Sequence, residues 1–285
     1  MIDLHTHSKI SDGSLNPEEL ILYAAEQKVS VVALTDHDST EGLERARCAA
    51  VKAGIVFVSG IELNVEWPTG EFHLLGLGLQ RISDEMISVT ERLQKSRDER
   101  NKTIIELMRA DGFAVSYEEL SFVANSSCIG RPHFAQYFVQ KGLVKNRQQA
   151  FDKFIAKGRP YYANRTGCAL DEGIEAIRSC GGVPVLAHPL SLYVSWGKMN
   201  GVLSELKEHG ICALEAWHPG ARPADCKRLE STARQLEFAV TAGSDFHGTD
   251  VRADRRIGHT SGGEKIDDRF WFEELVPLLE NVFCS

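Results

Sequence analysis

The sequence lacks any long apolar run. No stretch approaches the roughly 18 to 20 residues that a membrane-spanning helix needs. A basic segment followed by an apolar one is also missing at the start, where Met1 leads directly into Ile2-Asp3-Leu4. We therefore expect a cytoplasmic protein that does not enter a membrane.

Cysteines are scattered and show no useful spacing. There are seven, an odd number, and no two are spaced Cys-x-x-Cys. This argues against both a disulfide framework and a thiolate zinc site. With 43% hydrophobic and 25% charged residues among 285, the chain has the composition of a globular protein and the length of one large domain.

Positive charge is in deficit. The 32 Lys and Arg face 40 Asp and Glu, which gives a formal net charge of -8. Such a balance disfavours loose, charge-driven binding to nucleic acid or to anionic membranes. Bound cations would change this conclusion, because they concentrate positive charge in one place.

Short apolar runs rich in β-branched residues alternate with helical patterns, which predicts βα units with parallel strands. Strands are expected over 2–5, 31–36, 55–63, 71–79, 183–188, 213–217 and 238–243. Helices are expected near 17–27, 40–53, 170–180, 202–209, 224–236 and 269–279. These elements predict an α/β barrel with seven strands, one fewer than the common eight-stranded barrel.

The alternation stops in the middle of the chain. Between 81 and 166 the pattern is helical, with helices expected over 83–110, 117–124, 132–140 and 148–156. We therefore expect a barrel made of 1–80 and 167–285, and a helical insertion over 81–166 that contributes to the substrate pocket. Its basic residues are for the most part expected on a solvated helix face.

Histidines and carboxylates gather at the expected strand ends. His5 and His7 are two apart, so both imidazoles can project to one side of an extended chain. In Ser11-Asp12-Gly13 the glycine permits a tight turn that returns the Asp12 carboxylate. Further groups of the same kind lie at or near the other strands, namely His37, Glu62, His73, His188, Asp245 and His247.

Any one of these residues could be an ordinary core or surface residue, but the set is different. Nine such groups at one barrel mouth would repel one another and be costly to desolvate unless cations filled the space. Imidazole and carboxylate ligands without thiolate suit manganese, iron or zinc, and these residue types do not decide among the three metals.

The motifs resemble those of the polymerase and histidinol phosphatase (PHP) superfamily. The resemblance rests on His5-Thr6-His7, Ser11-Asp12-Gly13, Thr35-Asp36-His37-Asp38, Gly60-Ile61-Glu62, Ala187-His188-Pro189 and Gly243-Ser244-Asp245-Phe246-His247. In the insertion, Gly130-Arg131-Pro132-His133-Phe134 resembles the stand-alone branch of the family. That branch includes nucleoside 3′,5′-bisphosphate phosphatases and 5′-3′ exoribonucleases.

The resemblance implies a distorted (β/α)7 barrel that holds three divalent metals. By position, His5, His7, Glu62 and Asp245 would hold the first metal. Glu62 would bridge to a second metal held by His73 and His188, and Asp12, His37 and His247 would hold the third. Three divalent ions would reduce the formal charge to about -2, which makes an anionic substrate compatible with an acidic protein.

The implied reaction is phosphoester hydrolysis by a metal-bound hydroxide, held by Glu62, His5, His7 and Asp245. Arg131 and His133 stand at the start of an expected helix, where a guanidinium and free amides can hold a second phosphate. Arg97 and His218 are weaker candidates for contact with substrate.

The expected substrate is a nucleotide or short RNA with a 5′-phosphate, cut at its 3′-phosphoester. Two alternatives remain, a histidinol phosphate phosphatase and a non-catalytic PHP module that serves as an interaction domain. Nothing in the sequence indicates an obligate protein partner.

Overall fold

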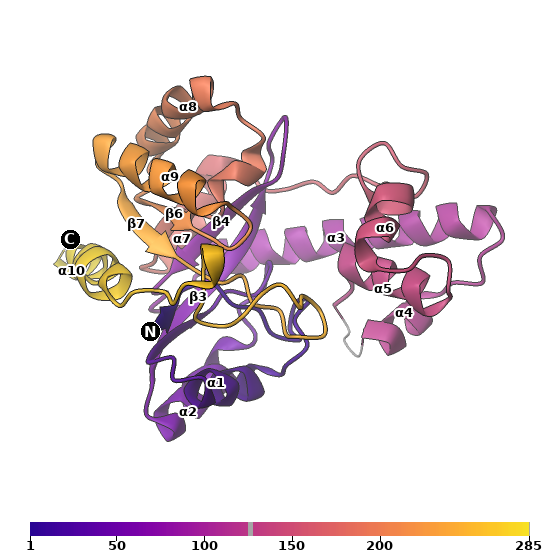
Figure 1. Ribbon diagram of the computed structural model, residues 1–285, viewed down its shortest axis with the longest axis horizontal. Helices are drawn as coiled ribbons and strands as arrows, with labels where there is room; N and C mark the ends of the chain where they lie inside the picture. Colours follow the sequence, from indigo (N-terminus) through magenta and orange to yellow (C-terminus); the bar gives the residue numbers. More distant parts are fainter. Residues whose placement is uncertain (125–127, 285) are drawn as a thin grey trace.

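The computed structural model describes residues 1–124 and 128–284. Its centre is a seven-stranded sheet with the strands in chain order, curved into a nearly closed barrel (Figure 1). The strands are β1 (Ile2–Asp3), β2 (Val31–Leu34), β3 (Val56–Val65), β4 (Phe72–Leu77), β5 (Val183–Leu186), β6 (Ala213–Trp217) and β7 (Ala239–Ala242). All seven expected strands are present, most of them shorter than the patterns suggested.

The expectation of a wholly parallel series is wrong at β4. This strand pairs antiparallel with both β3 and β5, while the other neighbours pair in parallel. The reason is that only residues 66–71 connect β3 to β4, whereas a parallel connection needs a dozen or more residues. Because β4 runs the other way, its first residues lie at the same edge as the last residues of the parallel strands. His73 therefore reaches the barrel mouth from the start of its strand.

Backbone hydrogen bonds beyond the strand ends connect β7 to β1. The Leu4 amide donates to the Ala242 carbonyl at 3.4 Å, and the His7 amide donates to the Phe246 carbonyl at 2.9 Å. These bonds fix the His5 to His7 segment against the segment that carries Asp245.

Helices cover the outside of the barrel. They are α1 (Pro17–Glu26), α2 (Leu43–Ala53), α7 (Leu170–Ser179), α8 (Trp196–His209), α9 (Pro223–Gln235), a π-helical turn η4 (Phe270–Leu275) and α10 (Val276–Cys284). Short 3-10 turns, η2 (Pro189–Leu192) and η3 (Ser261–Gly263), lie in the loops. The sequence places the start of α8 six residues too late, because Gly197 and Gly201 weaken the helical pattern there.

The helical insertion stands to one side of the barrel (Figure 1). It contains α4 (Tyr117–Ala124), α5 (Arg131–Gln140), α6 (Arg147–Ala150) and a π-helical turn η1 (Phe151–Ile155). The long helix α3 (Asp84–Ala110) connects the two parts. Met86 and Leu93 near its start pack in the barrel core, whereas Ile104 and Met108 pack in a second apolar core.

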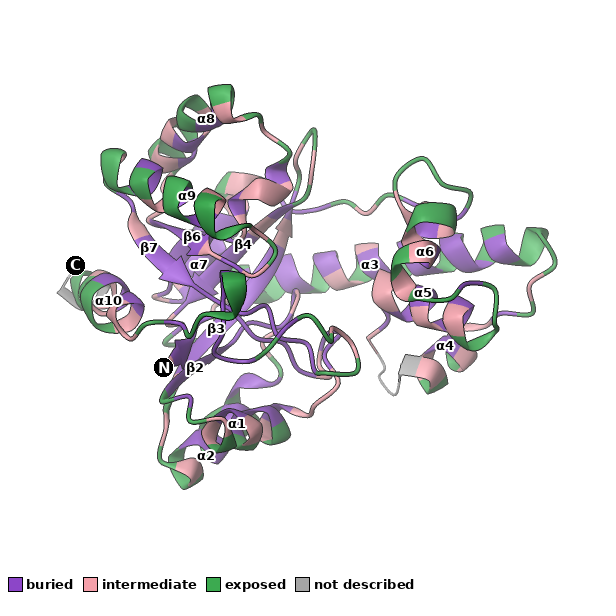
Figure 2. Ribbon diagram, in the orientation of Figure 1, coloured by how far each residue is buried: buried purple, intermediate pink, exposed green. Residues whose placement is uncertain are grey.

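The burial pattern follows this division. The sheet and the inner faces of the helices are buried, while the outer helix faces are exposed (Figure 2). Among the described residues, no helix is both long and apolar enough to cross a membrane. The six cysteines whose side chains are described form no disulfide, and the side chain of Cys284 lies outside the described part of the structure.

Candidate active site

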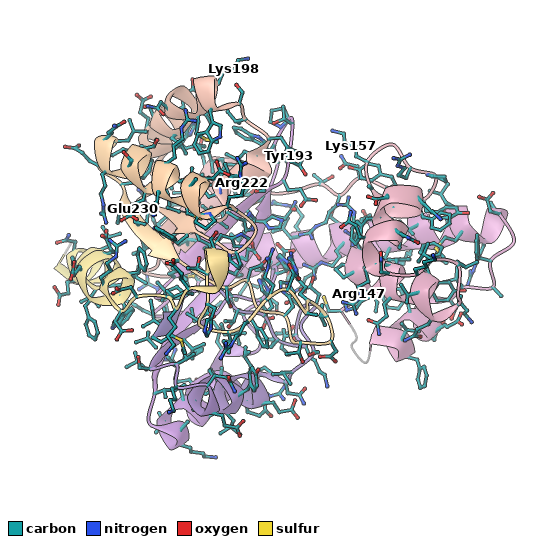
Figure 3. The ribbon with its side chains drawn as sticks, in the orientation of Figure 1. Arg147, Lys157, Tyr193, Lys198, Arg222 and Glu230 are labelled. Atoms are coloured by element: carbon teal, nitrogen blue, oxygen red, sulfur yellow. The ribbon has the colours of Figure 1, made fainter. Side chains whose placement is uncertain are left out.

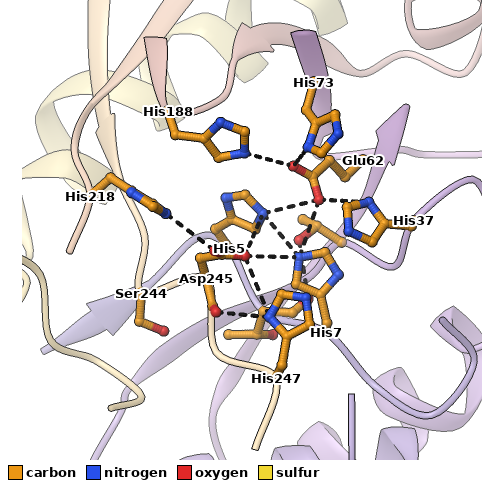
Figure 4. A network of polar contacts seen from close by, with 12 residues as sticks. His5, His7, His37, Glu62, His73, His188, His218, Ser244, Asp245 and His247 are labelled. Atoms are coloured by element: carbon orange, nitrogen blue, oxygen red, sulfur yellow. Dashed lines mark hydrogen bonds and ion pairs between the residues drawn. The ribbon is translucent and has the colours of Figure 1, made fainter. Parts of the chain in front are cut away.

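All nine histidines and carboxylates expected at the strand ends meet at the barrel mouth (Figure 4). They fall into overlapping groups whose ligand atoms lie within 4.8 Å of one another. The groups are His7, Asp12, His37 and His247; His5, His7 and Asp245; His5, Glu62 and His188; and His37, Glu62 and His73.

Glu62 is at the centre of this cluster and is fully buried. Its Oε2 atom lies 3.3 Å from His5 Nε2, 3.2 Å from His7 Nε2 and 2.9 Å from His37 Nδ1. Its Oε1 atom lies 2.9 Å from His73 Nδ1 and 3.1 Å from His188 Nε2. The two oxygens therefore face two different sets of imidazoles, as a bridging carboxylate would.

Asp12 enters the cluster from the turn after His7. Its Oδ1 atom lies 3.1 Å from His247 Nε2 and 3.9 Å from His37 Nε2. Asp36 holds this turn by accepting hydrogen bonds from the Ser8 amide and from both serine hydroxyls of the turn. Gly13 is needed because a Cβ atom there would lie 2.4 Å from the His7 carbonyl oxygen. Close approach, rather than a positive φ, requires this glycine.

The loop after β7 carries Asp245 in a left-handed backbone conformation, with φ of 52°. His188 is also left-handed, with φ of 28°. Non-glycine residues adopt such angles at an energetic cost, and they concentrate at functional sites. Asp245 Oδ1 lies 3.5 Å from His7 Nε2 and 3.7 Å from His5 Nε2.

Two buried carboxylates that the sequence analysis missed orient the cluster. Glu215 accepts a hydrogen bond from His5 Nδ1 at 2.9 Å, and its other oxygen accepts from the His188 amide at 2.9 Å. Asp3 accepts from the amides of Ser244 and Gly258. The signal was a single acidic residue inside an otherwise apolar strand, a pattern that by itself does not show what the carboxylate faces.

The contact with Glu215 decides how His5 presents its ring. A carboxylate only accepts, so His5 Nδ1 carries a hydrogen, and Nε2 is the ring atom that faces the cluster. His7 Nε2 lies only 3.0 Å from that atom. A proton or another cation must lie between two ring nitrogens that approach this closely. Carboxylate support of a histidine is the arrangement that orients metal ligands.

Without metal ions, protonated imidazoles balance the carboxylates of the cluster. Burial would lower the pKa of His5, yet Glu215 and Glu62 together hold that pKa well above its usual value. Burial would raise the pKa of Glu62, but His37, His5 and His73 hold it well below its usual value. Glu62 Oε2 and Asp12 Oδ1 are buried and face imidazole nitrogens at ion-pair distance. His7 Nδ1 is buried without a hydrogen-bond partner in the described part of the chain. This donor set fits divalent cations.

Arg131 and His133 lie at the first turn of α5, next to the cluster. A Cβ atom on Gly130 would lie 3.7 Å from Asp12 Oδ2, so this turn borders the mouth directly. His133 is buried, and its Nδ1 accepts the Gly130 amide hydrogen at 2.9 Å. Nε2 therefore carries the ring hydrogen. Burial lowers the pKa of His133 to about 4, so it is a neutral donor at pH 7.

Arg131 is held from both sides. Its Nη1 lies 3.3 Å from Glu71 Oε1, and its guanidinium stacks 5.1 Å from the centre of the Tyr162 ring. Its Nε is buried without a hydrogen-bond partner among the described residues. Arg131 therefore has capacity left for a ligand.

Arg97 is more strongly engaged than the sequence suggested. Its Nη2 bonds Asp38 Oδ2 at 2.5 Å and the His37 carbonyl at 3.1 Å. Arg165, which the sequence analysis did not single out, bonds the same Asp38 oxygen. Together the two arginines join α3 and the end of the insertion to the loop after β2.

His218 lies behind Asp245 rather than inside the cluster (Figure 4). Its Nε2 is 3.3 Å from Asp245 Oδ2, the oxygen that also accepts from Arg252 at 2.9 Å. The Gly220 amide donates to His218 Nδ1, so Nε2 carries the hydrogen. Contact with substrate remains a prediction for His218.

The insertion also touches the loop after β7. Arg147 lies on the side of the insertion that faces the barrel (Figure 3). Its guanidinium donates to the Val251 carbonyl and, at 2.7 Å, to Gln136 Oε1. The mouth is thus bordered by the insertion at α5 and at α6.

Known proteins resemble this chain in sequence and in fold. The model of the PHP domain matches residues 3–158. A 3′,5′-nucleoside bisphosphate phosphatase of Chromobacterium violaceum is 30% identical over 98% of this chain and 98% of its own length. A 5′-3′ exoribonuclease of Haemophilus influenzae is 30% identical over 86% of this chain and 89% of its own length. A solved amidohydrolase structure from C. violaceum has a TM-score of 0.88 at 29% identity and covers 99% of this chain and 96% of its own.

Proposed function

This chain belongs to the PHP family of metal-dependent phosphoesterases, and we propose that it hydrolyses the 3′-phosphoester of nucleotides that carry a 5′-phosphate. One observation carries the proposal. The first turn of α5, with Arg131 and His133, lies directly beside Asp12 of the histidine and carboxylate cluster. A group that binds a second phosphate therefore stands next to the groups suited to metals.

The proposed ligand assignment follows the distances. His5, His7, Glu62 and Asp245 would hold one metal, Glu62, His73 and His188 a second, and Asp12, His37 and His247 a third, with manganese the expected metal. When bound, such ions lower the pKa of water, polarise a phosphoryl oxygen and stabilise the leaving oxygen.

Side chains of this protein would orient the ligand histidines and bind the substrate. Glu215 keeps the hydrogen of His5 on Nδ1, so that Nε2 stays a ligand atom. Arg131 and His133 Nε2 would donate hydrogen bonds to the 5′-phosphate. This contact would position the 3′-phosphoester at the barrel mouth. A guanidinium matches two phosphate oxygens at once, which fixes the orientation of the nucleotide.

Two substrates share this chemistry. A bare 3′-phosphate on the nucleotide corresponds to the activity for which the C. violaceum relative is named, and a continuing RNA strand to that of the H. influenzae relative. Histidinol phosphate fits less well, because its cationic groups would meet Arg97, Arg131 and Arg165. A non-catalytic module would have no use for nine converging ligand groups.

The test is a substrate panel of adenosine 3′,5′-bisphosphate, a short 5′-phosphorylated RNA and histidinol phosphate, assayed with manganese. We expect phosphate release from the first or mononucleotide release from the second, and little reaction with the third. Faster hydrolysis of histidinol phosphate than of either nucleotide substrate would overturn the proposal. No hydrolysis with metals bound would favour the interaction module.

A further inference from the structure

Arg100 of α3 is a buried cation that the description above leaves unexplained. It lies one turn after Arg97 and is 6% exposed. In the described part of the chain, its hydrogen bonds run from Nε and Nη2 to the neutral amide oxygen of Asn101, at 3.2 and 2.9 Å. Among the described residues, no carboxylate lies within ion-pair distance of it. A buried charge without a counter-ion is costly in the free protein.

The surroundings of Arg100 are themselves cationic. Burial lowers the pKa of Arg100 well below its usual value, and Arg131, Arg165 and Arg97 lower it further. Two carboxylates form ion pairs with this group of four arginines. Asp38 pairs with Arg97 and Arg165, and the exposed Glu71 pairs with Arg131. The charge of Asp12 at the barrel mouth also acts on Arg97, whereas Arg100 pairs with none of these carboxylates.

Unused hydrogen-bond donors accompany the excess charge. The Nε atoms of Arg97, Arg131 and Arg165 are all buried without a partner in residues 1–124 and 128–284. Asn101 ties Arg100 to the same place, because its amide nitrogen donates to the Ile129 carbonyl at 2.8 Å, directly before the first turn of α5. The positive charge and the unused donors together suit the binding of a doubly charged anion.

We propose that Arg100 is a specificity-determining residue which, together with Arg131 and Arg165, neutralises a doubly charged 5′-phosphate monoester. The inference rests on the proposed function and adds to it. The pocket requires a terminal monoester, with two negative charges, rather than a diester or a 5′-hydroxyl. Arg100 is kept charged and unpaired in the free protein at the expense of stability, and the substrate supplies the missing partner.

The test measures equilibrium binding by calorimetry to the manganese-loaded protein. Adenosine 5′-monophosphate serves as the ligand, because it lacks a 3′-phosphate and is not turned over. Its 5′-methyl ester, with one charge, and adenosine, with none, complete the series. The variant is Arg100→Gln. The matched control is Arg92→Gln, which removes an exposed arginine of the same helix that pairs with Glu172.

We expect Arg100→Gln to weaken binding of adenosine 5′-monophosphate about 10- to 150-fold, the range for a hydrogen bond to a charged group. Binding of the methyl ester should weaken less and that of adenosine should not change. The unfolding temperature of Arg100→Gln without nucleotide should equal or exceed that of wild type, since an unpaired buried charge is removed.

Two results would overturn the inference while leaving the proposed function intact. One is a folded Arg100→Gln protein that binds adenosine 5′-monophosphate as tightly as wild type. The other is a marked drop in unfolding temperature or loss of folding, which would make Arg100 a structural residue. Failure of wild type to hydrolyse both adenosine 3′,5′-bisphosphate and the 5′-phosphorylated RNA would instead refute the proposed function.

Discussion

The barrel mouth buries carboxylates, whereas the arginine pocket beside it, formed by Arg97, Arg100, Arg131 and Arg165, buries positive charge. At the mouth, the buried carboxylate oxygens Glu62 Oε2 and Asp12 Oδ1 face only imidazole nitrogens among the described residues. In the pocket, buried guanidinium donors on Arg97, Arg131 and Arg165 have no hydrogen-bond partner among those residues. The first region suits cations and the second an anion. On the proposed function, a phosphorylated substrate together with metals would satisfy both regions.

The comparison also separates two ways of holding a charged group. At the mouth, the strand ends and the hydrogen bonds of Asp3 and Glu215 fix the ligand groups. In the pocket, long arginine side chains reach inward from α3, α5 and the end of the insertion. The two regions should therefore respond differently to substitution.

The largest effect should come from Glu62→Gln, which removes the carboxylate that faces both sets of imidazoles. We expect at least about a 1,000-fold loss of kcat/KM, because metal catalysis contributes several kcal/mol. His37→Ala and Asp245→Asn should also abolish hydrolysis. Steady-state kinetics and metal analysis check this, with Glu66→Gln, an exposed residue just after β3, as control. Substantial activity with full metal content would refute the assignment.

A smaller and selective effect is expected from Arg131→Ala. If its contact with the 5′-phosphate contributes about 2 to 3 kcal/mol, kcat/KM for adenosine 3′,5′-bisphosphate should fall about 30- to 150-fold. Adenosine 3′-monophosphate, which lacks that phosphate, should be hardly affected. The metal content should stay that of wild type.

The control for Arg131→Ala is Arg159→Ala, an exposed arginine of the same insertion. The comparison of two proteins on two substrates cancels general effects on folding or metal content. Equal losses on both substrates would disprove the pocket and leave the metal cluster as the only recognition element.

Glu215→Gln should affect the mouth without affecting the pocket. Loss of the charged partner of His5 is expected to reduce metal affinity or activity about 10- to 100-fold. Metal titration followed by kinetics measures this. The ratio of kcat/KM between adenosine 3′,5′-bisphosphate and adenosine 3′-monophosphate should stay as in wild type. A change in that ratio would show that the two regions are not independent.

The smallest effect concerns the charge of His133. Its pKa of about 4 lies below the usual value, so the ring is charged only below about pH 4 and neutral from pH 6 to 8. From pH 6 to pH 8, the ratio of wild-type to His133→Asn activity on adenosine 3′,5′-bisphosphate should vary by less than about 2-fold. A ratio that rises steadily from pH 8 to pH 6 would mean that a charged imidazole binds the phosphate.

Much of the site could be predicted because strand ends meet at one edge of a barrel. The order of apolar runs and the histidines after them was enough to bring His5, His188 and Asp245 together. The direction of β4 could not be read in the same way, because an apolar run has the same pattern in both directions. Only the short connection from β3 hinted at it.

The sequence by itself determined the nine histidines and carboxylates of the cluster, the seven strands and the two residues at the start of α5, since each depends on local pattern or on a motif. Tertiary structure alone decided which charges are paired. Glu215 lies 210 residues from His5, and Asp3 lies 241 residues from Ser244. Arg97 pairs with Asp38, whereas Arg100, one turn later, has no ion-pair partner among the described residues. Charge pairing depends on distance in space, which a one-dimensional pattern does not record.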